Sequence, residues 1–158
     1  MEANPTTHEK ERFAGFRAAG VNRLSLGVQS FRQDALDFLG RTYSVADAES
    51  ALTHIAGTFP RYSFDLIYAL PDQTEAEWRR QLDHALGFGS THISLYQLTF
   101  EPGTRFYQWM QSGKISPLAD EAAADLYDIT VGTLEKAGLL RYEVSNFAPP
   151  KHLSLIHI

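Results

Sequence analysis

Four polar side chains stand where the chain could bind a polar ligand. Glu2, Gln29 and Asp65 lie in or beside predicted strands, and Arg41 follows a short predicted helix. A carboxylate such as that of Asp65, set in the apolar stretch SFDLIYALP, is costly to bury unless it is hydrogen-bonded or paired with a cation. Barrel interiors are normally filled with aliphatic side chains, so several polar groups at one rim predict a binding site.

Each of these side chains also has a plain structural explanation. Asp65 could pair with Arg23 or Arg41 inside a barrel. Gln29 could satisfy backbone groups at the turn from strand to helix. Arg41 follows the helix-ending Gly40 and could complement the negative end of that helix. The residue types alone leave the structural and the binding explanations open.

The elements that must position these residues follow from the hydrophobic pattern and from helix-capping signals. Strands are separated by helices of ten or more residues, which predicts right-handed βαβ units, a parallel sheet, and either an open doubly wound sheet or a barrel segment. In both architectures ligands gather at the carboxyl ends of the strands. Predicted strands cover 21–29, 62–70, 92–100 and the extended stretch 140–147, and predicted helices run from Thr6 to Gly20, Ser30 to Gly40, Ser44 to Gly57, Thr74 to Gly87 and Leu118 to Ala137.

Three details of these elements are also predicted. Thr6 and Glu9 form a capping-box pattern at the start of the first helix, and Ser30 with Gln33 opens the second. The stripe of Phe106, Trp109 and Met110 is most simply explained by core packing.

Composition narrows the class of protein. The 158 residues are 44% hydrophobic and 21% charged, as expected for one soluble globular domain. The net charge of −5 favours neither nucleic acid nor an anionic membrane as a partner. Apolar runs are too short for a membrane span, and the start lacks a secretory leader, so the predicted compartment is the cytoplasm.

Several kinds of chemistry are excluded or disfavoured. The chain has no cysteine, which rules out disulfides, thiolate catalysis and a cluster ligated by its own sulfur. The histidines at 8, 54, 84 and 92 lack the paired spacing of a metal site, and neither a phosphate-binding glycine loop nor a serine-hydrolase elbow is present. No metal ligand or catalytic residue is therefore assigned.

The two ends of the chain do not follow this pattern. Residues 1–5 look like a strand end that leads into a helix, without the strand that should precede it. The last six residues, LSLIHI, resemble the translation of a sequencing adapter, so we treat 153–158 as an artefact. The alternative is a genuine short terminal strand. On the first interpretation the chain is an internal piece of a longer protein.

Six motifs, in this order, resemble a known family. Together they are similar to the oxygen-independent coproporphyrinogen III oxidase-like branch of the radical S-adenosylmethionine (SAM) enzymes, over nearly all of 1–152. GVQSF and YQLTFEPGT resemble the heme-chaperone (HemW) type, whereas the oxidase (HemN) type usually has Asp after GVQ. The motifs are EANP (2–5), AGVNRLSLGVQSF (19–31), LGR (39–41), FDLIYALPDQT (64–74), HISLYQLTFEPGT (92–104) and YEVSNFA (142–148).

The resemblance implies an α/β fold, a partial TIM-like (β/α)6 barrel whose lumen holds a [4Fe–4S] cluster and SAM. On this basis residues 1–113 supply the barrel core from the end of strand 3 through strand 6, and 114–152 begin a C-terminal region. The cofactor-binding positions that match the family are Glu2, Gln29, Arg41 and Asp65, with Thr99 as a further contact.

The resemblance also gives these side chains roles. The guanidinium of Arg41 can offer a forked donor to the SAM carboxylate. Glu2 can accept hydrogen bonds from the ribose hydroxyls, and the amide of Gln29 can donate and accept at the same diol. Asp65 adds negative potential for a cationic cofactor and can orient Arg41.

The chain also departs from the family pattern. The CxxxCxxC cluster motif and a GGTP-type loop would lie upstream of Met1, and an HNxxYW-type motif is expected just after 151–152. The family's usual glycine before LP is Ala69, a mild change if its φ is negative. The chain by itself is therefore predicted to be inactive.

For the longer protein the family implies a role in heme or porphyrin metabolism. The implied partners are SAM, heme or porphyrin, a heme-accepting protein and an electron donor. Two alternatives remain: a coproporphyrinogen III oxidase proper, and a cluster-free α/β binding domain that is complete as it stands. The second alternative is disfavoured because an open half-barrel would expose strand edges and an apolar lumen.

Overall fold

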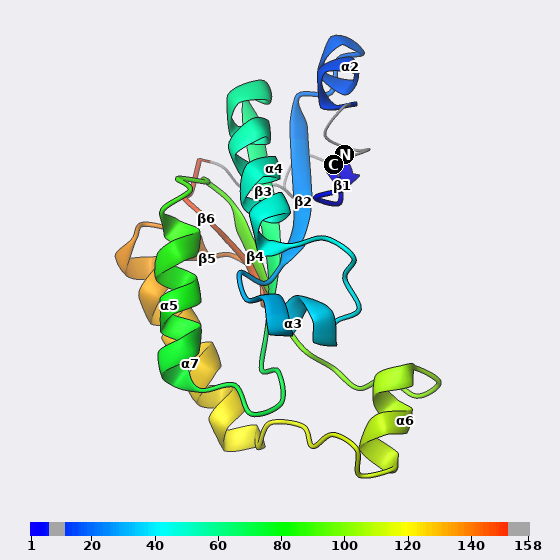
Figure 1. Cartoon of the computed structure of the whole chain (residues 1–158). Coiled ribbons are helices and arrows are strands. Elements are labelled where there is room, and N and C mark those ends of the chain that lie inside the picture. The colour runs from blue at the N-terminus through cyan, green and yellow to red at the C-terminus, as the bar shows by residue number, and fades with distance from the viewer. Residues whose placement is uncertain (7–11, 152–158) are drawn as a thin grey trace.

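The computed structural model describes residues 1–6 and 12–151, and strands alternate with helices along most of this length (Figure 1). Glu9 of the predicted capping box and the segment 153–158 lie outside the described residues. The elements are β1 (Glu2–Ala3), α2 (Phe13–Ala18), β2 (Arg23–Gln29), α3 (Gln33–Phe38), α4 (Val45–Thr58), β3 (Arg61–Tyr68), α5 (Glu75–Leu86), β4 (Ile93–Gln97), α6 (Arg105–Gln111), α7 (Asp120–Lys136), β5 (Leu140–Arg141) and β6 (Asn146–Ala148).

The strands form one mixed sheet in the order β1-β2-β3-β4-β6-β5. β1 to β4 pair in parallel, as predicted, so their carboxyl ends lie at one edge. β6 pairs antiparallel with both β4 and β5, so the prediction of a wholly parallel sheet is wrong at the C-terminal end. The physical reason is length, because the connection 142–145 between β5 and β6 is too short for the crossover that parallel pairing needs.

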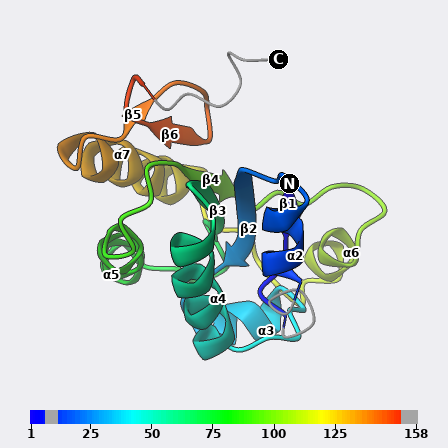
Figure 2. The same ribbon diagram turned by 90° about the horizontal axis from the view of Figure 1, so that it is seen from above.

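One face of the sheet is apolar and covered by helices. Helices α4, α5 and α7 lie on one side of the sheet (Figures 1 and 2). Along β2, Leu24, Leu26 and Val28 alternate with polar residues and are fully buried on this side, where each contributes about 1.5–3 kcal/mol. The same face receives Phe64 and Leu66 from β3. We call it the covered face, and the opposite side of β1 to β4, which carries the intervening residues, the open face.

Helix ends follow the predicted chemistry at two sites and depart from it at a third. Ser44 opens α4 and Thr74 opens α5, each with a complete capping box. Ser30 does not cap a helix: α3 begins at Gln33 without a side-chain cap, and the Ser30 hydroxyl donates to Gln81 of α5 at 2.8 Å. Helix α5 is joined to α7 by Trp78, whose indole N–H donates to a threonine hydroxyl at 2.8 Å.

Helix α6 stands apart from the other helices (Figures 1 and 2). All seven of its residues are described, and none of them is buried. Phe106 packs on Phe38 with ring centroids 5.0 Å apart, and Trp109 lies under the cations of Arg105 and Lys114. The prediction that the aromatic stripe of this helix packs in the core is therefore wrong.

Among residues 1–6 and 12–151, three residues other than glycine have positive φ angles, and each ends β2 or lies just after β3. They are Gln29 (φ +68°), Ala69 (φ +58°) and Asp72 (φ +58°). The condition under which Ala69 would be a mild change from glycine is therefore not met, because a Cβ in the left-handed region costs roughly 1–2 kcal/mol. Strain of this kind tends to gather at functional edges of a fold.

Candidate functional site

The open face carries a polar pocket of about 360 Å³ in place of the expected apolar lumen. Strand register explains why polar side chains from several strands meet there. Glu2 pairs with Ser25, and Asp65 pairs with Ser94, so these side chains stand in neighbouring rows on one face. The pocket is lined by Met1, Glu2, Arg23, Ser25, Ser63, Asp65, His92, Ser94, Tyr96 and Asn146.

Asp65 is the half-buried acid of this pocket. Burial raises its pKa above the usual range, and the nearby negative charge of Glu2 adds to that rise. Hydrogen bonds from Ser94 and Ser25 and the positive charge of Arg23 act in the opposite direction. The Ser25 hydroxyl lies 3.4 Å from Asp65 Oδ1 and accepts in turn from Ser63 at 2.8 Å.

Glu2 and Asp65 therefore line one pocket, and they come from β1 and β3, the two strands that flank β2. The arginine whose charge acts on Asp65 is Arg23, at the amino end of the neighbouring strand β2. This agrees with the structural explanation in which Asp65 is balanced by Arg23. The charged side chains that line the pocket are two acids and Arg23, and the amino group of Met1 also lies in the lining, where it donates to the Arg23 carbonyl at 3.1 Å.

Gln29 lies at the carboxyl end of β2, beyond the residues that line the pocket. Its backbone forms a three-residue turn, in which the Ser30 N–H donates to the Val28 carbonyl at 2.9 Å. Its side chain folds back over Gly27: a Cβ placed on Gly27 would lie 2.8 Å from the Gln29 amide nitrogen and 3.4 Å from Asn4 Oδ1. A side chain at Gly27 would therefore displace Gln29, and the glycine leaves room for the amide to lie across the strand.

Arg41 follows α3 and the left-handed Gly40. Its backbone N–H donates to the Leu36 carbonyl at 2.9 Å, so the main chain rather than the guanidinium closes the helix. The Nε atom of Arg41 is buried and has no acceptor within the described part of the chain. A buried guanidinium nitrogen without an acceptor is the kind of donor that an anionic ligand group would satisfy.

Thr99 lies beyond the end of β4 and is exposed, and its side chain forms no hydrogen bond within the described part of the chain. The five predicted contacts thus fall into two groups. Glu2 and Asp65 share the pocket, whereas Gln29, Arg41 and Thr99 lie at or beyond the carboxyl ends of the strands, outside its lining.

Sequence reasoning missed a second polar pair at the floor of the pocket. The His92 ring nitrogen Nε2 lies 2.6 Å from the hydroxyl of Tyr142, fifty positions away in the sequence. Burial lowers the pKa of His92 to about 4, and the nearby Arg23 acts in the same direction. Both residues belong to the HISLYQ and YEVSNFA stretches, but only the antiparallel pairing of β4 with β6 brings them together.

Asn4 and Asn146 were missed as well. Asn4 reaches the space above Gly27, and Asn146 accepts a hydrogen bond from Ser94 at 2.9 Å. The signal that could have found them was position: Asn4 directly follows β1, and Asn146 stands opposite Ser94 in the ladder.

The signature of the radical SAM superfamily matches residues 1–85, more than half of the chain. The chain belongs to the radical SAM superfamily. In superfamily members SAM and a [4Fe–4S] cluster are the implied cofactors. The predicted fold class is confirmed, since the structure superposes on the radical SAM coproporphyrinogen III oxidase HemN of Escherichia coli with a TM-score of 0.83 and 24% identity, covering 96% of this chain and 35% of that one.

Curated relatives of this radical SAM chain are of two named kinds. The protein "Radical S-adenosyl methionine domain-containing protein 1, mitochondrial" of Danio rerio is 44% identical, over 94% of this chain and 34% of its own length. Heme chaperone HemW of Synechocystis is 40% identical, over 96% of this chain and 37% of its own length. HemW of Escherichia coli is 39% identical, over 95% of this chain and 39% of its own length. The chain thus spans between a third and two fifths of the length of these relatives.

The residues present suit one of the two implied cofactors. SAM carries a positive sulfonium and a carboxylate. The acids of the pocket suit the positive group, and the unsatisfied Arg41 nitrogen suits the carboxylate. The space over Gly27, where the Gln29 amide lies, leaves room for a polar ligand contact. The cluster is different, because the 158 residues include no cysteine thiolate to hold iron. Within 1–6 and 12–151 no group of three or more His, Asp or Glu side chains is arranged for a metal, and no helix is long and apolar enough to cross a membrane.

Proposed function

We propose that the open face and its carboxyl edge form the SAM-binding half of a radical SAM protein. The observation that carries the proposal is the unsatisfied, buried Nε of Arg41, in the segment that follows the carboxyl end of β2, since ligands of α/β folds gather at the carboxyl ends of strands. The guanidinium would hold the SAM carboxylate with charge-assisted hydrogen bonds.

The remaining contacts divide the ligand among them. Glu2 accepts from the ribose hydroxyls, and the amide of Gln29, lying across Gly27, donates and accepts at the same diol. Asp65 supplies negative potential for the sulfonium, and Thr99 supplies a further contact beyond β4. When a cluster is bound by other parts of the protein, it supplies the electron for SAM cleavage; the residues described here bind and orient the ligand.

For the full-length protein we propose the role of a HemW-type heme chaperone. Three kinds of support point the same way: the relatives named heme chaperone, the superfamily signature, and the HemW-type form of GVQSF and YQLTFEPGT. Heme or porphyrin, a heme-accepting protein and an electron donor are the proposed partners. Cytoplasm is the proposed compartment, and localisation of the full-length protein tests it against the mitochondrial location that some relatives carry in their names.

The SAM site is tested with the full-length protein after anaerobic cluster reconstitution. Arg41→Ala should weaken SAM binding by about 1.5–3 kcal/mol, the usual contribution of a hydrogen bond to a charged group. Calorimetry of SAM binding measures this. Arg61→Ala, at the amino end of β3 and far from the carboxyl edge, is the matched control and should leave the affinity unchanged. An unchanged dissociation constant for Arg41→Ala removes that residue from the site.

The chaperone role needs its own experiment. The full-length protein is incubated with heme and, separately, with coproporphyrinogen III under anaerobic reducing conditions. Stoichiometric heme binding without protoporphyrinogen formation supports the chaperone. Conversion of coproporphyrinogen supports an oxidase and contradicts the proposal, and so does an upstream coding sequence without CxxxCxxC.

A further inference from the structure

The turn at the end of β2 is strained. The hydrogen bond from the Ser30 N–H to the Val28 carbonyl, with φ of +68° at Gln29 between them, is that of a γ-turn with a positive central φ. This form is rare, and a residue other than glycine in it costs about 1–3 kcal/mol. A conformation of that cost persists only where surrounding contacts impose it.

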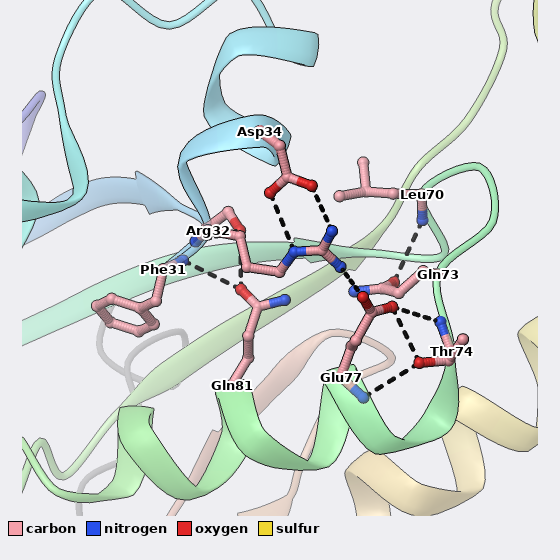
Figure 3. Close-up of polar contacts among 9 residues, drawn as sticks. Phe31, Arg32, Asp34, Leu70, Gln73, Thr74, Glu77 and Gln81 are labelled. Carbon is pink, nitrogen blue, oxygen red and sulfur yellow. Dashed lines mark hydrogen bonds and ion pairs between the residues drawn. The ribbon is translucent and has the colours of Figure 1, made fainter.

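Gln81 of α5 imposes it from the covered side. Its side-chain oxygen accepts from the Ser30 hydroxyl at 2.8 Å and from the Phe31 backbone N–H at 3.0 Å (Figure 3). The Ser30 oxygen accepts in turn from the Arg32 N–H at 3.1 Å. One buried carboxamide oxygen therefore fixes the two residues that follow Gln29 directly.

The orientation of the Gln81 amide shows which of its contacts matters. The Phe31 backbone N–H can only donate, so the oxygen of Gln81 faces the turn and the NH₂ group faces away. Gln81 is only 4% exposed, and its Nε2 atom is buried and lacks an acceptor among the described residues. An unsatisfied buried donor is costly, and an apolar side chain would avoid the cost. The two hydrogen bonds that the Gln81 oxygen accepts from Ser30 and Phe31 are what the amide contributes to set against this cost.

Three further contacts restrain the turn at the end of β2 and the loop that follows it. On the other side of the turn the Tyr43 hydroxyl donates to the Gly27 carbonyl at 2.8 Å. The first turns of α5 are tied to the same loop by Arg32, which forms an ion pair with Glu77 at 2.9 Å and a second one with Asp34 (Figure 3). The end of β2 is thus held from the loop before α4 and from α5 together.

We propose that Gln81 is a positioning residue for the ligand site. By holding Ser30 and Phe31 it maintains the positive φ of Gln29, and so keeps the Gln29 amide folded over Gly27 where it can meet the ligand. Gln81 does not itself line the pocket of the open face. The inference rests on the proposed SAM site, since Gln29 is one of its predicted contacts.

The first test replaces the acceptor in the full-length, cluster-reconstituted protein. Gln81→Met keeps the length of the side chain and removes the oxygen, and it should weaken SAM binding about 10-fold. Gln81→Glu keeps an oxygen for Ser30 and Phe31 and should restore affinity to within about 3-fold of the native protein. Trp78→Phe, on the same helix, removes one buried hydrogen bond without contacting the turn and should bind SAM as the native protein does.

The second test separates positioning from general destabilisation. In a Gln29→Ala background, Gln81→Met should change SAM affinity by less than about 2-fold, because no amide remains to be aimed. Equal losses in both backgrounds, or native affinity in Gln81→Met alone, overturn the inference.

A third measurement is independent of SAM. In a Gln29→Gly background the turn needs no clamp, because glycine adopts positive φ freely. Gln81→Met should then lower the unfolding midpoint by less than half of its effect in the native background. If the native protein fails to bind SAM, the proposed function fails, and this cycle still decides whether Gln81 holds the turn: equal effects in the two backgrounds contradict it.

Discussion

The covered and the open face of the sheet are made by the same strands and have opposite chemistry. On β3, Phe64 and Leu66 are fully buried beneath helices, while Ser63 and Asp65 alternate with them on the other side. The covered face gains its stability from apolar burial. The open face holds a half-buried acid whose pKa is raised, an arrangement that costs stability and suits a ligand. Substitutions should therefore separate by face, into those that affect folding and those that affect binding.

The largest expected effect lies on the covered face. Phe64→Ala should lower the free energy of unfolding by about 3–5 kcal/mol, because it empties a fully buried ring site. Ser63→Ala, its neighbour on the open face, removes one hydrogen bond of 2.8 Å and should cost only about 0.5–1.5 kcal/mol. Urea denaturation compares the two. Equal costs would erase the distinction between the faces.

An intermediate effect is expected from pH at the floor of the open face. The pKa of His92 is lowered by burial from 6.5 to about 4, so the folded state prefers the neutral ring. Stability that is fully present above pH 6.5 should be lost as the pH falls toward 4, by up to about 3 kcal/mol. Unfolding free energies at pH 7, 5.5 and 4.5 measure this slope. His92→Gln should flatten it, and an unchanged slope in that variant would show that other groups cause the acid sensitivity.

The smallest effect is expected at the carboxyl end of β3, where Ala69 follows the strand. Ala69→Gly should raise the free energy of unfolding by about 0.5–1 kcal/mol, since glycine relieves the positive φ but loses more chain entropy. The control is Ala56→Gly, on the exposed side of α4, which should lower stability by about 1 kcal/mol. Thermal unfolding of both variants is sufficient, and a loss of stability in Ala69→Gly would show that the alanine is not strained.

Much of the covered face could be predicted from the sequence. The alternation in 21–29 and 62–70 predicted both strands to within two residues, and Ser44 and Thr74 were correctly predicted to begin two helices. These signals are local, and so they survive without knowledge of the fold. Glu2 and Asp65 were both named as candidates from the sequence, and both line the pocket of the open face.

The features that were missed depend on contacts distant in sequence. The strands β5 and β6 have two and three residues, too few for a periodic pattern, so their antiparallel pairing was not foreseen. The partner of His92 is fifty positions away and is set by that pairing. Ser30 looked like a helix cap because its sequence neighbours fit one, but a buried amide of α5 takes its hydroxyl. Tertiary contacts decided each of these cases.

The two tryptophans lie in contrasting surroundings, and this gives the molecule two optical reporters. Trp78 is fully buried and stacked on Tyr68 with ring centroids 5.4 Å apart, so its emission should be blue-shifted and should move to longer wavelength only when the core opens. Trp109 lies on α6 with a guanidinium and an ammonium over its ring, 4.4 and 4.5 Å from the centroid. Its emission should respond to salt and to any macromolecule that covers α6. Two single-tryptophan variants, one retaining Trp78 and the other Trp109, would therefore let the core and the outlying helix be followed separately.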